Sequence, residues 1–291
     1  MRQLDKVDLV GLGWRTELAP SILSHLDDIE VVEVIIDDYF KRPLSKLRPL
    51  QTLTSQVPVI YHGVGLGLAS SFPVAQKRLD LLARVFDYLA PSLWSEHLAF
   101  VRAGNIEIGH LAAPPRTLAT VEGALENLER IRKSVGSKPA LENIATLLSP
   151  PGSIFQEGEW TQQIVQPAGC SLLLDLNNLY SNAINFGFSP AAYLKTFPLH
   201  LVQLVHLSGG KWVDEPKGYN GRRLLDDHIH DVPDPVFELL GILARTTSQP
   251  LTVIIERDGN YPPFEHLLNE IKQAKAILRE ARECSLLEGV A

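Results

Sequence analysis

The sequence predicts an α/β fold of a single domain, and a closed (β/α)8 barrel (the TIM-barrel architecture) is the arrangement that fits best. Roughly eight apolar segments alternate with segments of helical periodicity along the 291 residues. They are spread evenly, and no linker rich in Ser or Gly divides the chain. Most of the apolar segments end on a histidine or a carboxylate. The expected core covers about residues 7–282, with a frayed C-terminal tail, and a doubly wound open sheet is the alternative.

The predicted strands are rich in Val, Ile and Leu, which is typical of strands that a parallel sheet buries on both faces. The first strand runs into Gly11 and Gly13. These glycines are interpreted as a tight turn at the barrel mouth, because a dinucleotide-binding fingerprint needs a third glycine. In chain order, the strands are predicted over 7–15, 29–36, 58–61, 93–98, 139–141, 171–175, 203–205 and 251–255.

Helical periodicity separates these strands. In the clearest case, over 74–89, apolar residues recur on one face of the helix. Pro235 favours a helix start, because proline fits the first turn. The helices are predicted over 18–26, 44–53, 74–89, 120–135, 159–165, 190–197, 235–244 and 264–282. Residues 103–106 are expected to form the turn of a small hairpin, and 209–223 a polar loop.

Composition narrows the classes of partner. The net charge of −7 argues against a nucleic-acid backbone, which needs a basic field. No apolar run approaches the roughly 18 residues of a membrane helix, and the N-terminus lacks the apolar region of a signal peptide. The two cysteines, Cys170 and Cys284, do not suggest a disulfide framework. These observations predict a cytoplasmic protein without a membrane or nucleic-acid partner.

A set of histidines and carboxylates follows the predicted strands. The carboxyl ends of barrel strands converge on one mouth, so these residues are expected to meet there. Nitrogen and oxygen donors without thiolates suit divalent iron, manganese or zinc. The set is too large for one ion, so two or three ions that share Glu142 as a bridge are predicted. Its members are His62, His97, Glu142, Asp175, His206, Asp226, His228, His230 and Glu256.

Each member of this set also has an ordinary structural interpretation. A single histidine at a strand end is commonly a hydrogen-bonded polar residue, and Asp226 and Asp227 could cap a helix. Glu256 and Arg257 could form a surface ion pair. Their joint position after so many strands favours a metal centre.

These residues, in this order, resemble the multinuclear non-haem iron-dependent oxidative enzymes (the MNIO family), which are TIM barrels. The resemblance spans residues 8 to about 260. The ligand order is also similar to that of the wider superfamily of xylose isomerases and apurinic endonucleases. The matching segments are His62-Gly63-Val64-Gly65-Leu66, Ser95-Glu96-His97-Leu98, Glu142-Asn143, Leu174-Asp175-Leu176-Asn177-Asn178, Val205-His206-Leu207-Ser208-Gly209, Asp226 to Val236, and Ile255-Glu256-Arg257-Asp258.

The resemblance implies three metal sites. The first would be held by His62, His97 and Glu142, and the second by Glu142 together with Asp175, His206 and Glu256. The third would take Asn178, Asp226 and His228. Asn178 stands where endonuclease-like relatives have a histidine, so this site is expected to be labile or empty. His230 is expected to be a ligand, an orienting partner or a proton donor, and Arg257 and Asp258 to orient the last ligand or bind substrate.

The resemblance further implies O2-dependent modification of a Cys, Asp or aromatic residue of a ribosomally made precursor peptide. The cofactor would be two to three iron ions in a mixed-valence Fe(II)/Fe(III) centre, with zinc or manganese as substitutes to be tested. A separate peptide-recognition protein is a further expected partner. The 209–223 loop is a candidate lid or peptide clamp, with an ordinary surface loop as the alternative. Two other classes stay open. One is a zinc- or manganese-dependent hydrolase or isomerase, and the other a non-catalytic metal-binding partner protein.

Overall fold

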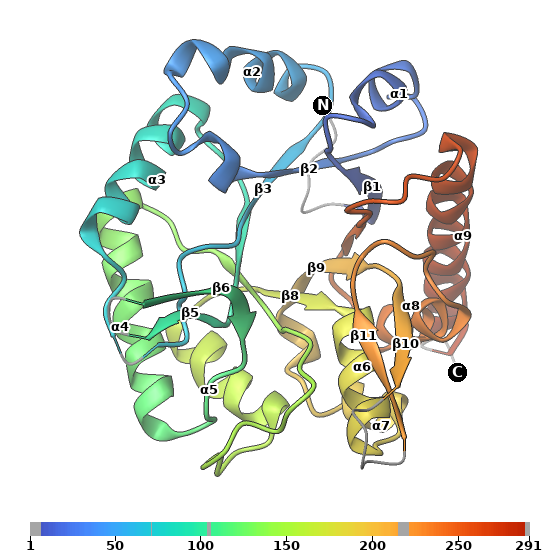
Figure 1. Ribbon diagram of the computed structural model, residues 1–291. Helices are drawn as coiled ribbons and strands as arrows, with labels where there is room; N and C mark the ends of the chain where they lie inside the picture. The colour runs from blue at the N-terminus through green and yellow to red at the C-terminus, as the bar shows by residue number, and fades with distance from the viewer. Residues whose placement is uncertain (1–6, 71, 104–105, 215–220, 289–291) are drawn as a thin grey trace.

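Eight parallel strands close into a barrel, which confirms the predicted fold and excludes the open sheet (Figure 1). The computed structural model describes residues 7–70, 72–103, 106–214 and 221–288. The barrel closes where the first strand pairs with the last, with Leu9 opposite Thr252. In their order around the barrel, the strands are β1 (Leu9–Gly13), β12 (Thr252–Ile255), β9 (Val202–Leu207), β8 (Leu172–Asp175), β7 (Ala140–Glu142), β4 (Trp94–His97), β3 (Val59–Gly63) and β2 (Val32–Ile35).

Helices surround the strands and cover the outer face of the barrel (Figure 1). Short 3-10 helices (Ile36–Tyr39, Leu44–Lys46 and Leu199–Leu201) lie in the connections. Within the described ranges, no helix combines the length and the apolar run that a membrane span needs. The α-helices are α1 (Ala19–Ser24), α2 (Arg48–Thr54), α3 (Gln76–Leu89), α4 (Leu118–Val135), α5 (Glu157–Ala168), α6 (Leu176–Phe186), α7 (Pro190–Leu194), α8 (Asp234–Thr246) and α9 (Phe264–Glu288).

Helix α6 is absent from the sequence-based prediction, although it starts directly after strand β8. Asp175 ends the strand and also caps the helix, since its Oδ1 accepts a hydrogen bond from the Asn178 amide at 2.7 Å. Four asparagines lower the intrinsic helix propensity of this segment, which explains why no helix was predicted there. Helix α9 also differs, because it continues to Glu288 rather than fraying after 282.

Two antiparallel hairpins follow barrel strands on the mouth side. Strands β5 (Phe100–Ala103) and β6 (Ile106–Ala112) form the hairpin that was expected, with its turn at 104–105 outside the described residues. The predicted polar loop over 209–223 is in part wrong, because β10 (Gly210–Asp214) pairs with β11 (Arg222–Asp226). Tyr219 of that loop lies outside the described residues.

The glycines of β1 also differ from the expectation of a turn. Both lie within the strand, and a Cβ atom on Gly11 would fall 1.7 Å from the carbonyl oxygen of Val31. Gly11 therefore allows β1 to approach the chain that enters β2.

An apolar layer fills the barrel interior at some distance from the mouth. The candidate site lies between this layer and the mouth. The apolar layer consists of Leu9, Val31, Ile60, Ala140, Leu173, Leu204 and Ile254, all almost fully buried. Successive strand residues face opposite sides of a sheet, so the residue two positions later faces the same interior. The side chains at these later positions form the candidate site.

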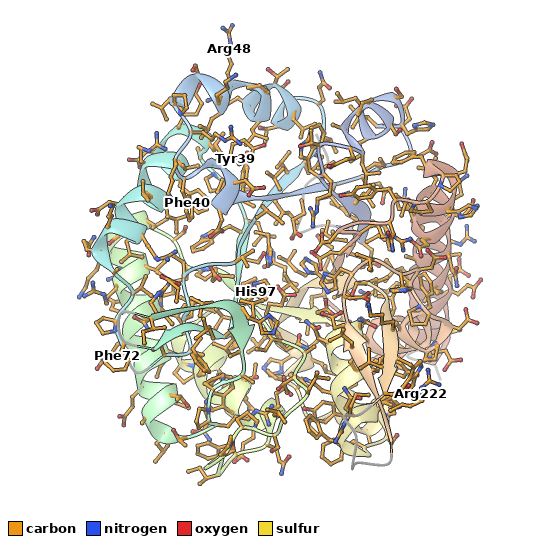
Figure 2. All side chains as sticks on the ribbon, in the orientation of Figure 1. Tyr39, Phe40, Arg48, Phe72, His97 and Arg222 are labelled. Atoms are coloured by element: carbon orange, nitrogen blue, oxygen red, sulfur yellow. The ribbon has the colours of Figure 1, made fainter. Side chains whose placement is uncertain are left out.

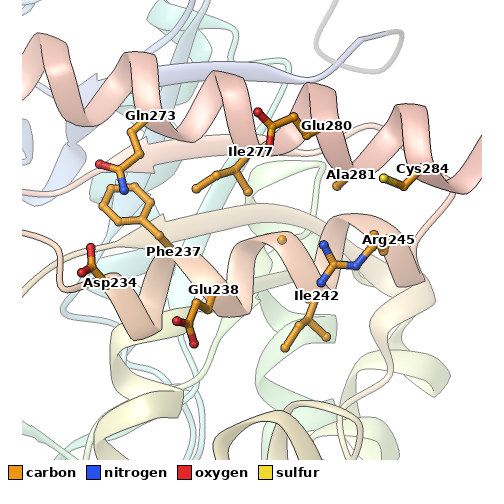
Figure 3. A pocket seen from close by; sticks show the side chains of 11 residues that line it. Asp234, Phe237, Glu238, Ile242, Arg245, Gln273, Ile277, Glu280, Ala281 and Cys284 are labelled. Atoms are coloured by element: carbon orange, nitrogen blue, oxygen red, sulfur yellow. The ribbon is translucent and has the colours of Figure 1, made fainter.

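A groove of about 560 Å³ lies between α8 and α9 on the outside of the barrel, away from that interior (Figure 3). Gly241 of α8 lines it, and a Cβ there would meet Arg245 and Ile277 at ordinary contact distances of 3.5 Å. Gly241→Ala is therefore expected to stabilise the fold by about 0.5–1 kcal/mol, because alanine favours a helix interior. Thermal unfolding by circular dichroism measures this. Gly158→Ala in α5 is the contrasting control and should destabilise, since its Cβ would lie 2.3 Å from the Thr196 carbonyl oxygen.

Candidate metal centre

Two residues beyond the apolar layer, the barrel interior becomes polar. Six polar side chains face the interior at this level, and we call them the polar layer. Each of them is 5% exposed or less. Strand alternation explains this layer, since each member stands two positions after an apolar-layer residue, within a strand or directly next to its end. The polar layer is Glu33, His62, Glu142, Asp175, His206 and Glu256.

The first ligand set joins β3, β4 and β7. The Nε2 atoms of His62 and His97 lie 3.4 Å and 3.3 Å from the same oxygen, Oε2 of Glu142. The other ring nitrogen of each histidine is already engaged, with Ser95 Oγ at 2.8 Å and with the Gly63 carbonyl at 3.3 Å. Figure 2 labels His97 near the centre of the view, over the barrel interior. These contacts aim both Nε2 atoms at one point beside Glu142.

The second ligand set shares Glu142. His206 Nδ1 lies 3.2 Å from Glu142 Oε1 and 3.0 Å from Glu256 Oε2. Asp175 completes a group whose ligand atoms all lie within 4.8 Å of one another. Glu142 thus presents one oxygen to each set, which is the arrangement of a carboxylate that bridges two ions.

A third group lies beside the second, at the end of β11. His228 Nε2 is 3.0 Å from Asp226 Oδ2 and 3.9 Å from Asp175 Oδ2, and His228 Nδ1 is 3.4 Å from Glu256. The backbone of His228 has φ +54°, an uncommon conformation for a residue other than glycine. It is held by hydrogen bonds to the Gly209 carbonyl and from the Asp258 amide. Strain of this kind is concentrated at functional sites.

Buried lone pairs test whether these residues fit a cation. Native proteins pair almost all buried polar atoms. Several in these three groups make no well-aligned hydrogen bond to the described residues, even where a carboxylate oxygen lies 3.0 Å away. All of them are oxygens or imidazole nitrogens that can bind a cation. They are Glu142 Oε2, Asp175 Oδ2, Asn178 Oδ1, His206 Nδ1 and His228 Nε2. The residues therefore fit metal ions, and the oxygen and nitrogen donor set suits iron, manganese or zinc.

Electrostatics also favour positive charge here. Burial would raise the pKa of Glu142, but the neighbouring His97, His206 and His62 lower it to about 2. Burial together with the charge of Asp226 raises the pKa of Asp175 well above its usual value. Burial alone would lower the pKa of His206, yet Glu256, Glu33 and Glu142 raise it well above the usual value. Burial lowers the pKa of His97, which keeps this imidazole neutral and available as a ligand.

The three predicted catalytic residues occupy different positions. Asp258 lies at the centre, with Oδ2 3.5 Å from His228 Nδ1. His230 is more exposed and contacts Asp227 Oδ1 through Nδ1 at 2.8 Å. The Arg257 guanidinium donates to the carbonyls of 259 and 260 and to Asp231, so it stabilises the loop after β12. Their catalytic roles stay predictions.

Two residues of the centre escaped the sequence analysis. Glu33 lies inside strand β2, within a run of β-branched residues and not after the end of the strand, where the other candidates were sought. Arg15 follows β1, and its Nε donates to Asp258 Oδ1 at 2.9 Å, while Nη2 lies 4.0 Å from Glu256 Oε1. Nothing in the sequence around Arg15 indicates this contact.

Two carboxylates, of half-buried Asp37 and buried Glu96, hold the loop that follows His62. Asp37 accepts hydrogen bonds from the amides of Val64 and Gly65, at 2.9 Å and 3.1 Å. A Cβ on Gly63 would lie 2.6 Å from Glu96 Oε2, and one on Gly65 would lie 2.7 Å from Asp37. The glycines of this motif therefore allow the loop to pack against the two acids, which fixes the end of β3.

The loop after β11 is anchored to α9 by Glu270, which accepts a hydrogen bond from the Val232 amide at 2.8 Å. Burial raises the pKa of Glu270 to about 7. The folded protein therefore holds this proton more tightly than the unfolded chain, and stability should be lost as pH rises from about 4.5 to about 7. Relative to Glu270→Gln, which keeps the acceptor, the wild type is expected to lose about 1–2 kcal/mol between about pH 5 and about pH 8. Urea unfolding with a chelator present measures the free energy of unfolding at each pH. If it depends on pH equally in the wild type and in Glu270→Gln, the prediction is contradicted.

The fold and the centre together define a class, a (β/α)8 barrel with a buried histidine and carboxylate cluster at its mouth. An L-ribulose 3-epimerase structure matches 97% of this chain and 98% of its own with a TM-score of 0.59 and 13% identity. A xylose isomerase-like TIM barrel/4-hydroxyphenylpyruvate dioxygenase fusion protein matches 97% of this chain and 44% of its own, with a TM-score of 0.61 and 15% identity. At these identities the likeness concerns the fold.

Within this class, the chain belongs to the RiPP precursor modification enzyme family MbnB/TglH/ChrH, whose model matches residues 9–279. A UPF0276 protein of Streptomyces avermitilis is 34% identical over 281 residues, which cover 93% of this chain and 55% of that protein. The chain thus spans about half the length of this relative. A UPF0276 protein of Chromobacterium violaceum is 31% identical, covering 94% of this chain and 96% of the relative. Membership supports an enzyme that acts on a precursor peptide.

Proposed function

We propose that this chain is a multinuclear non-haem iron-dependent oxidative enzyme that uses O2 to modify a Cys, Asp or aromatic residue of a precursor peptide. The observation that carries the proposal is the position of Glu142 between two unlike ligand sets. One set contributes two histidines, and the other contributes two further carboxylates and one histidine. Family membership supports the peptide as the substrate class.

When bound, a mixed-valence pair of iron ions would supply the activation of O2 and the oxidation of the substrate. His62 and His97 would hold the first ion through neutral imidazoles, which leaves its positive charge largely uncompensated. Asp175 and Glu256 would add two negative charges at the second ion and so favour its ferric state. Glu142 would hold both ions at a fixed separation. Asp226, His228 and Asn178 are proposed ligands of a third ion.

The β10–β11 hairpin is the proposed clamp for the peptide. It begins at Gly210, shortly after the end of β9, and its last residue, Asp226, belongs to the third group. Trp212 is exposed on it, with the Arg222 guanidinium 5.5 Å from the ring centroid. An exposed aromatic ring beside a guanidinium suits contact with an extended peptide. A separate recognition protein that delivers the peptide remains part of the proposal.

Metal analysis and Mössbauer spectroscopy on protein purified without O2 test the proposal. We expect at least two iron ions per chain, in both oxidation states after limited exposure to air. Stoichiometric zinc or manganese with no iron, even after anaerobic reconstitution with a ferrous salt, would overturn it and favour a hydrolase or isomerase instead. Iron that binds but does not react with O2 would favour the non-catalytic metal-binding protein.

A further inference from the structure

Glu33 lies on the side of His206 that faces away from the two ligand sets. Its Oε2 is 3.0 Å from His206 Nε2, and both side chains are buried, with exposures of 1% and 0%. The opposite ring nitrogen, Nδ1, faces Glu142 and Glu256. The imidazole is therefore held between one carboxylate on one side and two on the other.

This contact crosses the barrel interior. Glu33 belongs to β2 and His206 to β9, and strands β1 and β12 lie between them in the sheet. Glu33 reaches the centre because it stands two residues after Val31 of the apolar layer, on the inward face. Nothing in the family resemblance or in the predicted ligand sets assigned a role to this residue.

Hydrogen-bond chemistry fixes the ring. An ionised carboxylate only accepts hydrogen bonds, so the proton of the Glu33 contact must be on Nε2 of His206. A metal ligand must be a neutral imidazole, and this leaves the lone pair on Nδ1. That atom faces Glu142 and Glu256 but makes no well-aligned hydrogen bond to the described residues. A histidine that binds a metal typically donates its other N–H group to a carboxylate in this way.

We propose that Glu33 is a positioning residue of the metal centre, which sets the tautomer and orientation of His206 so that Nδ1 binds the second ion. The proposal rests on the metal centre of the proposed function, but not on iron or on oxygen chemistry. It excludes Glu33 as a ligand, although its carboxylate also lies within 4.8 Å of His62 and His206 ligand atoms.

Zinc binding tests the proposal independently of activity. Isothermal titration calorimetry with Zn²⁺ on the metal-stripped protein should show that Glu33→Leu weakens the affinity of the second site about 10–100-fold. Glu33→Gln keeps an acceptor for the Nε2 proton and should retain most of the affinity. An equal loss in both variants would identify Glu33 as a ligand, and no loss in Glu33→Leu would remove its role; either result overturns the proposal. Asp8→Asn, at the opposite end of the barrel strands, is the charge-matched control.

The tautomer can also be observed directly. With ¹⁵N-labelled histidine and Zn²⁺ bound, the His206 ring should carry its proton on Nε2 and the metal on Nδ1. The reverse assignment would overturn the proposal. This measurement needs the wild type and Glu33→Gln alone, so it holds even where Glu33→Leu does not fold. Failure of the iron proposal would leave both zinc results unchanged.

Discussion

Glu142→Ala is expected to release the ions of both ligand sets together. Glu142 Oε2 faces His62 and His97, while its Oε1 faces His206, so one substitution removes a donor from each set. Removing a direct ligand weakens metal binding more than removing a residue that orients a ligand. The affinity for metal should therefore fall by more than about 100-fold at both sites. Iron content per chain and the Mössbauer doublets of anaerobically loaded protein measure the loss.

His97→Ala provides the contrast, since it removes a donor from the first set alone. This variant should lower the metal occupancy of the first ligand set and leave the occupancy of the second set unchanged. Glu122→Ala, on the exposed face of α4, serves as a matched control with full metal content. If Glu142→Ala keeps one ion at wild-type occupancy, the two sets are independent and the bridge is refuted.

Glu157→Leu is expected to cost the largest amount of folding free energy. The buried Glu157 carboxylate on α5 accepts hydrogen bonds from Arg116 at 3.1 Å, Asn182 at 3.2 Å and Tyr193 at 2.5 Å. Its removal would leave the Arg116 guanidinium, whose side chain is only 12% exposed, without its carboxylate partner, at a cost of about 3 kcal/mol or somewhat more. For a chain of this size, the melting temperature should fall by roughly 10 °C.

Urea unfolding of metal-free protein measures this cost. Glu159→Leu, two residues later and on the exposed face of α5, is the matched control. Tyr193→Phe should cost only about 1 kcal/mol, because it removes one hydroxyl donor. A change below about 1 kcal/mol in Glu157→Leu would show that the network does not stabilise the fold. The network also reaches the centre, since Asn182 donates to the Ile144 carbonyl just after Glu142 and Asn143.

Residues at strand ends were predictable from the sequence, because the ends of parallel strands must converge. His62, Glu142 and His206 are such residues, and the structure places a ring nitrogen of each histidine within 3.4 Å of a Glu142 oxygen. Glu33 was missed because its position depends on which face of β2 points inward, which the run of apolar residues on both faces hides. Helix α6 was missed because tertiary contacts of its asparagines offset their low helix propensity.

The pairing of β1 with β12 has a consequence during synthesis. Leu9 and its partner Thr252 are about 240 residues apart, and Arg282 of α9, which binds Asp8, comes later still. At a synthesis rate of about 5–20 residues per second, roughly 10–50 s pass between the synthesis of β1 and that of β12, the strand that closes the barrel. Throughout that time the hydrogen-bonding edge of β1 is open to other nascent chains. Slower growth at low temperature lengthens this interval, so yield of the full-length protein should depend on chaperones that shield the N-terminal half on the ribosome.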